Sequence, residues 1–269
     1  MSPTRRRFAE VVRSRPVDVG LACLLVGGEV DPDLDVETWT SVLDSLAGTV
    51  RLPAGAAPAQ VAEALRVALG EQAGFAGFAA DYDDLRASLL PEVLARGRGL
   101  PLLLSVVWLE VCRRLGVPAR PVALPGHVVV EIGRSWDDPA TAPGGSVVVD
   151  PFTGGRVVAA SVLAEHPPVP LGVDELLLRL LTNVRALTTR QPTGLGPATT
   201  RLWAVELSLL LPRHPAALRR ERGELLVRLG RHLEGADELE TYALVVEDAD
   251  EAEAAQSRTS GRAARAQLN

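Results

Sequence analysis

The sequence predicts an α+β fold in which a buried helix packs with a small antiparallel sheet, and further helices follow. The stretch "LPLLLSVVWLEVCRRLGVP" at 100–118 is apolar on nearly every face, as is typical of a helix inside a core. Short β-branched runs at 122–124, 128–132 and 147–149 then indicate strands. Helical periodicity returns from residue 174 onward, so strands and C-terminal helices are separated along the chain.

The first hundred residues predict a series of helices that leads up to the buried one. Residues 6–50 show helical spacing of apolar side chains, and Asp35 in "DPDLD" suits the N-cap of a helix within that range. In order, we then expect a loop at 52–58, an amphipathic helix at 59–71, a glycine-rich connection at 74–84 and a short helix at 88–95.

The buried helix has a clear start and a clear end. Pro101 suits the first helical position, where its missing N–H costs nothing. Gly116 and Pro118 terminate the helix after Arg113 and Arg114. A helix that is hydrophobic all round must be covered on all sides. We therefore expect it to be the central element of its domain.

The segment after the helix predicts short antiparallel strands joined by loops. "RSWDDPATAPGGS" at 134–146 is expected to be a mobile hairpin loop, since it is rich in Pro, Gly and Asp. "GGRVV" at 154–158 predicts one more short strand, and "EHPPVPLG" at 165–172 a proline-rich linker.

The C-terminal part predicts paired helices, at 174–190, 199–211, 215–229 and 233–246. Small and large residues alternate over 222–242 in a spacing that resembles the helix–turn–helix of a tetratricopeptide repeat. Residues 250–269 lack periodicity and are expected to be disordered. The predicted division is a domain at 1–170, a helical domain at 171–249 and a tail at 250–269.

Composition excludes several classes of function. A net charge of −6 argues against nucleic-acid binding, which needs a basic face. All 28 basic residues are Arg, so no Schiff-base or P-loop lysine exists. No stretch reaches the roughly 20 apolar residues of a membrane span, and no signal peptide is evident, so we expect a cytoplasmic protein without membrane contact. No residue set has metal-ligand spacing, and we expect no metal and no cofactor.

Two ionisable residues stand at the ends of predicted strands. His127 opens one strand in "LPGHVVVEIG", and Asp150 closes another in "VVVDPFTGG". Together with "RGLPLLLSVVWLEVCRRLGVPAR", these motifs resemble the transglutaminase-like superfamily, which has the papain-related architecture. They are most similar to a bacterial branch often named after the SirB locus, which carries tetratricopeptide-like helices after the core. Ala87 departs from the branch, which usually has Asn there.

The resemblance implies a role for each of these positions. Active members of the superfamily have a Cys at the start of the central helix, a His on a strand and an Asp that orients the His. Here His127 matches the His and Asp150 matches the Asp, while the Cys position falls on Pro101. Proline has no nucleophile, and this branch typically has proline there.

Other residues are poor replacements for the missing thiol. Cys112 lies eleven positions after Pro101, about 16 Å along a helix and far beyond hydrogen-bond reach of the His. Cys23 belongs to a different apolar helix, and both cysteines are expected to be small core residues. Ser105 lies one turn after Pro101, but we expect its hydroxyl to bond back to a main-chain carbonyl.

Several functions remain open for the His127–Asp150 pair. The leading hypothesis is a pseudoenzyme, a binding, scaffold or regulatory module for a peptide or protein partner that uses the cleft and the tetratricopeptide-like helices. The alternative is a hydrolase or acyl-transfer enzyme with His127 as general base and Asp150 as its orienter. The pair can also be purely structural. A scaffold predicts that side chains such as Phe152 fill the region beside His127, whereas an enzyme predicts a pocket there.

Overall fold

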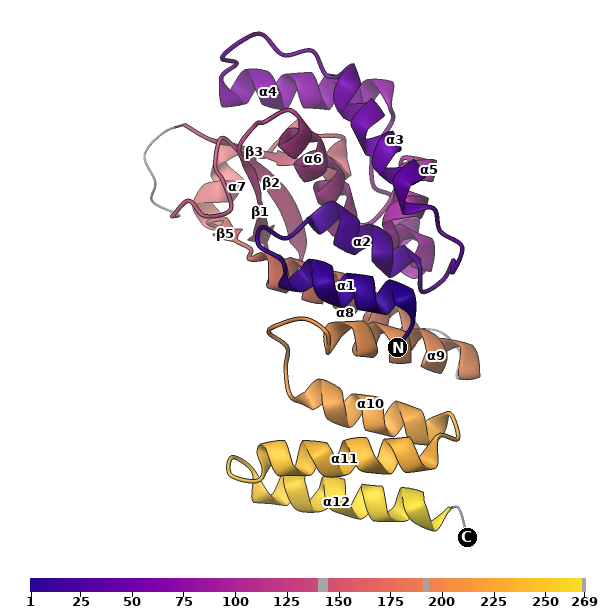
Figure 1. Ribbon diagram of the computed structural model, residues 1–269. Helices are drawn as coiled ribbons and strands as arrows, with labels where there is room; N and C mark the ends of the chain where they lie inside the picture. Colours follow the sequence, from indigo (N-terminus) through magenta and orange to yellow (C-terminus); the bar gives the residue numbers. More distant parts are fainter. Residues whose placement is uncertain (140–144, 191–193, 268–269) are drawn as a thin grey trace. The chain divides into compact units, whose positions relative to one another are not determined.

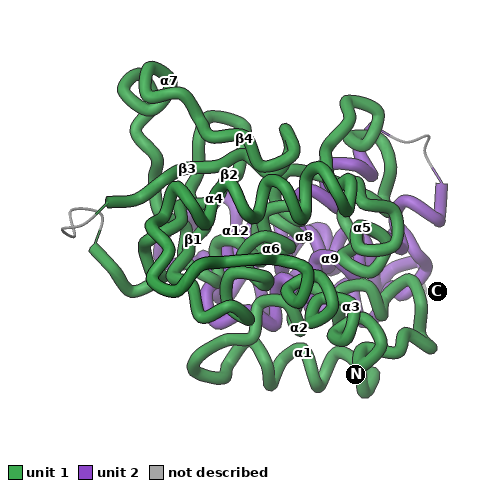
Figure 2. The backbone as a smooth tube through the Cα atoms, turned by 90° about the horizontal axis from the view of Figure 1, so that it is seen from above, with its two compact units in different colours: residues 1–180 green, residues 181–269 purple. Residues whose placement is uncertain are grey.

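The computed structural model describes residues 1–139, 145–190 and 194–267. Two compact units divide the chain, Met1–Leu180 and Leu181–Asn269 (Figure 2). Helix α8 (Val173–Arg190) contains the boundary between them. Residues 140–144 of the loop predicted at 134–146 lie outside the described part of the chain.

The first unit begins with helices that surround a central one (Figure 1). Its α-helices are α1 (Pro3–Arg13), α2 (Val19–Gly27), α3 (Val36–Thr49), α4 (Pro58–Leu65), α5 (Leu90–Arg96), α6 (Pro101–Arg114) and α7 (Ala160–Glu165). Helix α4 continues into a π-helix at Arg66–Gln72, and short 3₁₀ turns lie at Ala79–Asp83, Leu85–Ser88 and Pro151–Thr153. The carboxylate of Asp35 caps α3 by accepting from the N–H groups of Glu37 and Thr38, as predicted.

The five strands form one antiparallel sheet with the order β4-β3-β2-β1-β5. They are β1 (Ala119–Leu124), β2 (His127–Ile132), β3 (Val147–Asp150), β4 (Arg156–Val157) and β5 (Val169–Pro170). A two-residue turn joins β1 to β2, and Gly126 adopts the positive φ of 68° that such a turn requires. The segment at 165–172, which we predicted to be a linker, therefore includes an edge strand.

Helix α6 is the core element, as the sequence predicted. Every residue from Pro101 to Cys112 is buried. Trp108 is fully inaccessible and meets the ring of Phe75 edge-on, with 6.3 Å between the ring centroids. The Ser105 hydroxyl donates to the carbonyl of Val128 in β2 at 3.0 Å. The acceptor is a main-chain carbonyl, but it lies on the neighbouring strand and not, as we expected, on the helix itself.

A carboxylate fixes α2 against α6. The Glu110 side chain is buried and accepts a hydrogen bond from the backbone N–H of Gly20 at 3.1 Å. Arg113 and Arg114 donate to the same carboxylate at 2.8 and 2.5 Å. A Cβ atom at position 20 would lie only 2.6 Å from the Glu110 carboxyl carbon, so only glycine permits this approach.

The second unit is a series of antiparallel helices, α9 (Leu195–Ser208), α10 (Ala217–Arg228), α11 (His232–Val246) and α12 (Glu251–Ala266). Helices α10 and α11 approach closely at a reciprocal pair of glycines. A Cβ on Gly223 would lie 3.1 Å from the carbonyl of Gly235, and one on Gly235 would lie 2.8 Å from the carbonyl of Gly223. The order of the elements, with a five-stranded antiparallel sheet followed by helices, confirms the predicted α+β class.

Helix α12 corrects the prediction of a disordered tail. Residues 251–266 form a regular helix. Asp250 is its N-cap, and the Asp250 side chain accepts a hydrogen bond from the backbone N–H of Glu253. The buried face of α12 consists of Ala254, Ser257, Gly261 and Ala264. Small side chains give no hydrophobic periodicity, although they let two helices pack closely. The pattern on which the prediction depended was therefore missing.

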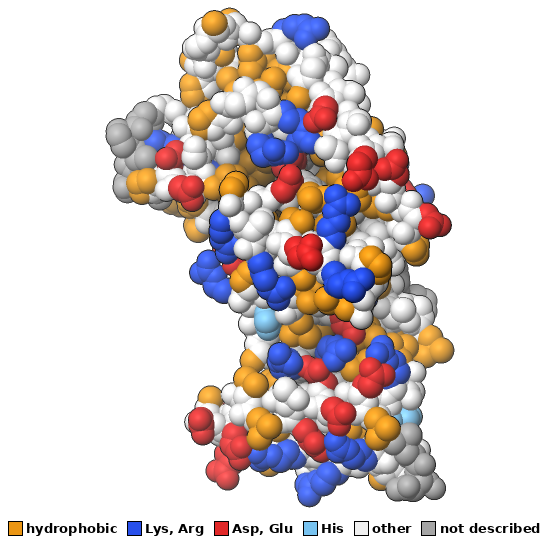
Figure 3. Space-filling model, viewed as in Figure 1, with side chains coloured by type: hydrophobic (Ala, Val, Ile, Leu, Met, Phe, Trp, Pro, Cys, Tyr) orange, Lys and Arg blue, Asp and Glu red, His pale blue; other side chains and the backbone are white. Residues whose placement is uncertain are grey.

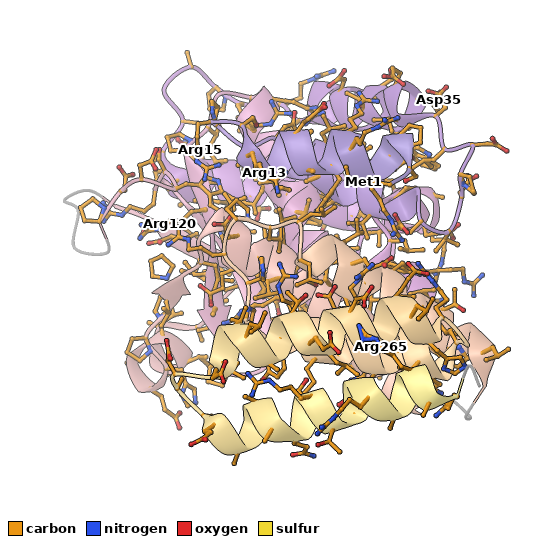
Figure 4. The ribbon with its side chains drawn as sticks, turned by 60° about the horizontal axis from the view of Figure 1, so that its bottom comes forward. Met1, Arg13, Arg15, Asp35, Arg120 and Arg265 are labelled. Atoms are coloured by element: carbon orange, nitrogen blue, oxygen red, sulfur yellow. The ribbon has the colours of Figure 1, made fainter. Side chains whose placement is uncertain are left out.

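Ion pairs between helices are frequent in the second unit, and Figure 3 shows blue and red side chains interspersed over its surface. Arg222 of α10 donates to Glu206 of α9 at 3.1 Å and to Glu238 of α11 at 2.6 Å. Arg265 reaches from α12 to Asp237 and Glu240 of α11 (Figure 4). The charged side chains of residues 219–228 thus link α10 to its neighbouring helices.

Candidate functional site

The structure brings His127 and Asp150 together. His127 is the first residue of β2, directly after the tight turn, and Asp150 is the last residue of the adjacent strand β3. The Nε2 atom of His127 lies 2.8 Å from Oδ1 of Asp150. Their side chains are 23% and 18% exposed, so solvent or a ligand can reach both. Asp150 Oδ1 also accepts from the N–H of Phe152 at 2.9 Å, which orients the carboxylate.

This contact fixes how the imidazole presents itself. An ionised carboxylate only accepts hydrogen bonds, so the proton of the neutral ring belongs on Nε2. Nδ1 then has a free lone pair, and it makes no hydrogen bond to the described residues. The ring therefore offers one acceptor to an incoming group. A pocket at Nε2 itself is ruled out because Asp150 occupies that side.

Aromatic side chains line the approach to His127. Phe152 meets the imidazole edge-on, with ring centroids 5.7 Å apart and planes at 88°. Tyr82 lies 6.2 Å from Phe152, between centroids, and its side chain is substantially exposed. A Cβ on Gly77 would overlap the Phe152 ring, so a glycine is required where this ring packs. Phe152 thus packs against one side of the imidazole.

The segment that supplies Tyr82 is held by an ion pair between a buried carboxylate and a partly exposed arginine. Asp81 is completely buried, and its Oδ1 accepts from Nε and Nη2 of Arg98 at 2.9 and 2.6 Å. Its Oδ2 accepts from the N–H of Phe78 at 3.2 Å. The Arg98 guanidinium stacks over the Phe78 ring, 5.0 Å from its centroid. Sequence reasoning treated this segment as a glycine-rich connection and missed its aromatic and acidic residues.

Comparison with known proteins identifies the architecture. A family model described as "Transglutaminase-like superfamily" matches residues 37–170, and a tetratricopeptide repeat model matches residues 198–260. A UPF0162 protein of Xylella fastidiosa is 31% identical over 236 residues, which cover 81% of this chain and 80% of the relative. The chain belongs to the transglutaminase-like superfamily. Its matched bacterial relatives carry the name UPF0162, and the SirB designation stays a prediction from the motifs.

Two further relatives match a smaller part of this chain. Human F-box only protein 21 is 26% identical over 140 residues, which are 49% of this chain but 22% of the relative. A UPF0162 protein of Pseudomonas aeruginosa is 36% identical over 84 residues, 30% of this chain and 27% of the relative. The similarity to the F-box protein is limited to part of that longer chain.

Neither thiol of this transglutaminase-like protein is exposed. Cys23 and Cys112 are free cysteines with no accessible surface. Burial raises the pKa of the Cys112 thiol to about 12. Burial, followed by the negative charges of Glu110 and Asp18, raises the pKa of the Cys23 thiol. Both side chains are therefore neutral thiols at physiological pH, and they serve as small core residues, as predicted.

A separate pocket lies among helices α1, α2, α3 and α6 of the first unit. Its volume is about 330 Å³, and Arg7, Asp18, Glu37, Glu110 and Arg114 are among the residues that line it. Arg114 pairs with Glu110, and Arg7 pairs with Glu37. These mutual contacts account for the charges, so the pocket gives no sign of a particular ligand.

The described residues contain neither a candidate metal site nor a candidate membrane-spanning helix. No group of three or more His, Cys, Asp or Glu side chains in that part of the chain could hold a metal ion. None of the described helices has both the length and the apolar content that crossing a bilayer requires.

Proposed function

We propose that this transglutaminase-like protein works without a catalytic thiol, as a binding or scaffold module for a peptide or protein partner. The observation that carries the proposal is the state of the two cysteines. A thiol nucleophile must reach the imidazole and form a thiolate. Cys23 and Cys112 are both buried, and burial keeps both thiols protonated.

The start of helix α6 supports the same conclusion. In active relatives the resemblance implies a Cys at this position, where a helix N-terminus stabilises a thiolate. Here α6 begins with Pro101, which is buried and has no reactive group. Ser105, one turn later, uses its hydroxyl proton for the carbonyl of Val128. It is buried as well, which argues against its being a nucleophile.

The tetratricopeptide-like helices support a partner that is itself a protein. Repeats of this kind usually mediate protein–protein interaction, and the match covers residues 198–260. The proposal therefore includes two contact regions, the surface around His127 and Asp150 and the helices of the second unit. A cytoplasmic location and a regulatory role through such a partner belong to this proposal too.

One observation favours a second candidate, an enzyme that uses His127 as a general base. The 2.8 Å contact with Asp150 leaves Nδ1 free to take a proton from water or from a substrate. Positioned proton transfer contributes about 10²–10⁴-fold, which is enough for activated esters and too little for unactivated amides. A hydrolase or acyl-transfer activity on a reactive substrate is consistent with that geometry.

A substrate screen separates the two candidates. Wild type, His127→Ala, Cys112→Ala and Cys23→Ala are compared for hydrolysis of an activated aryl ester and a chromogenic amide. A binding module predicts no turnover above buffer for any of the four. Turnover lost only in His127→Ala would establish the general-base enzyme. Turnover lost in either cysteine variant, with folding unchanged by circular dichroism, would show that a thiol is used and overturn the proposal.

A further inference from the structure

Three neighbouring strands place three polar side chains in a row on one face of the sheet. Asp150 of β3 is directly opposite Arg156 of β4, and side chains directly opposite in an antiparallel pair point to the same face. The contact between Asp150 and His127 of β2 puts the imidazole on that side as well. Neighbouring strands are about 4.8 Å apart, so β2 and β4, which carry His127 and Arg156, are roughly 10 Å apart. The register of β2 and β3 places His127 on the diagonal from Asp150, two residues beyond the position directly opposite.

Arg156 has no counterion among the residues that the structure describes. Its side chain is exposed, and it makes no hydrogen bond or ion pair with the residues that the structure describes. Its nearest carboxylate across the strands is Asp150, but Oδ1 of that group already serves His127 and the N–H of Phe152. By contrast, Arg98 is held by the buried Asp81. An unpaired guanidinium of this kind is suited to a carboxylate from another molecule.

The other end of the row presents an acceptor. Nδ1 of His127 has a free lone pair, as described above, and it suits an N–H or O–H donor of a ligand. Tyr82, whose ring contacts Phe152, adds a partly exposed aromatic surface beside the imidazole. The face therefore combines a hydrogen-bond acceptor, an aromatic contact and, about 10 Å away, a free positive charge.

We propose that this face binds an extended partner segment through an acidic side chain, an inference that rests on the proposed binding function. The carboxylate of an Asp or Glu would pair with Arg156, and a backbone N–H of the same segment would donate to His127 Nδ1. An extended chain rises about 3.3 Å per residue, so the two contacts lie roughly three residues apart in the partner. The His127–Asp150–Arg156 row thus selects for acidic peptides.

The test uses the full chain and a synthetic library of short peptides, acetylated and amidated at their ends, beside a matched library in which Asn and Gln replace Asp and Glu. We expect wild type to retain acidic peptides and few of the neutral ones. Arg156→Gln should weaken binding of the selected peptides about three- to fivefold, the range of an exposed ion pair, and make it less sensitive to salt. His127→Phe, which keeps a ring without Nδ1, should weaken binding too.

A matched control comes from Arg6→Gln, because Arg6 is exposed on α1 and also has no ion pair with the described residues. It should leave binding unchanged. If peptides bind without acidic preference, and His127→Phe weakens them while Arg156→Gln does not, this inference is wrong and the binding function stands. If wild type retains no peptide from either library, this inference is wrong as well.

Discussion

Helices α6 and α12 are both packed against neighbours, but their contact faces are made of opposite kinds of side chain. Helix α6 buries every residue from Pro101 to Cys112, and most of these are large aliphatic or aromatic. Helix α12 buries only Ala254, Ser257, Gly261 and Ala264. The first is stabilised by the apolar area it removes from water. The second depends on close approach, on the bond from Ser257 to the Leu239 carbonyl and on ion pairs.

The difference shows which part of the fold tolerates change. Truncating a side chain in α6 leaves a cavity, because surrounding atoms cannot collapse fully into the space. Enlarging a side chain where α10 and α11 meet forces backbones apart. Removal should therefore be costly in α6, and addition should be costly at the contact between α10 and α11.

The largest effect is expected from Trp108→Ala. Trp108 is completely buried in α6 and packs edge-on against Phe75, so truncation should lower the free energy of unfolding by about 3–5 kcal/mol. Urea denaturation followed by circular dichroism measures this loss. Val157→Ala, at an exposed position on edge strand β4, serves as the control and should change stability by about 0.5 kcal/mol or less. Equal losses in both variants would contradict the contrast.

The second effect comes from adding one methyl group at Gly235. Alanine favours a helix by about 1 kcal/mol over glycine. Its Cβ, however, would lie 2.8 Å from the carbonyl of Gly223 and 2.6 Å from a methyl of Val227. We expect Gly235→Ala to destabilise the protein by about 2 kcal/mol in urea denaturation. Gly196→Ala, where nothing lies within 4 Å, is the matched control. A gain in stability at position 235 would show that the helices separate easily.

The third effect depends on pH and reports how dry the environment of α6 is. Burial raises the pKa of Cys112 from 9.0 to about 12. Between these values the unfolded chain loses the thiol proton while the folded chain keeps it, so this contribution to stability is complete below pH 9 and is lost as pH rises toward 12. The unfolding free energy should fall by about 1.4 kcal/mol per pH unit for this group.

Cys112→Ala provides the comparison for the pH measurement, because it removes the titrating group and leaves Cys23 in place. The slope of unfolding free energy against pH should become shallower by about one proton per molecule in the variant. Identical slopes for the two proteins would mean that Cys112 ionises in the folded state.

The smallest effect is expected at Gly261 in α12. A Cβ there would lie 3.3 Å from the carbonyl of Ala236, which is tight, and 3.6 Å or more from its other neighbours. The gain in helix propensity and the strain of this one contact should nearly cancel. We expect Gly261→Ala to raise the unfolding free energy by about 0.5 kcal/mol. A loss of more than about 1 kcal/mol would show that α12 packs as tightly as α10 and α11 do.

The two helices also differ in how well the sequence predicted them. Helix α6 has a continuous apolar run with Pro101 at its start, and both signals are independent of the rest of the fold. Helix α12 was missed because alanine, serine and glycine do not register as a hydrophobic stripe. Its contacts depend on the position of α11, which a local pattern does not contain. The strands β1 to β4 were predicted, whereas two-residue β5 exists only through its pairing with β1.

The candidate site was predicted only in part. The resemblance pointed to His127 and Asp150, and the structure brings these two side chains into contact. Tyr82 and Asp81 were missed because each contacts a residue far away in the sequence. Tyr82 contacts Phe152, and Asp81 accepts from Arg98. Arg156 was missed because nothing in the sequence says that it lies opposite Asp150. Exposed aromatic residues within a glycine-rich segment are a signal that could have drawn attention to residues 78–82.

The contact between Gly20 and Glu110 has a consequence for how this protein can evolve. The glycine lacks a Cβ so that a carboxylate 90 residues away can reach its backbone N–H. Any larger residue at 20 displaces that carboxylate from two arginines as well. The two positions should therefore covary across related sequences: a bulkier amino acid at the first should be accompanied by a shorter, uncharged one at the second.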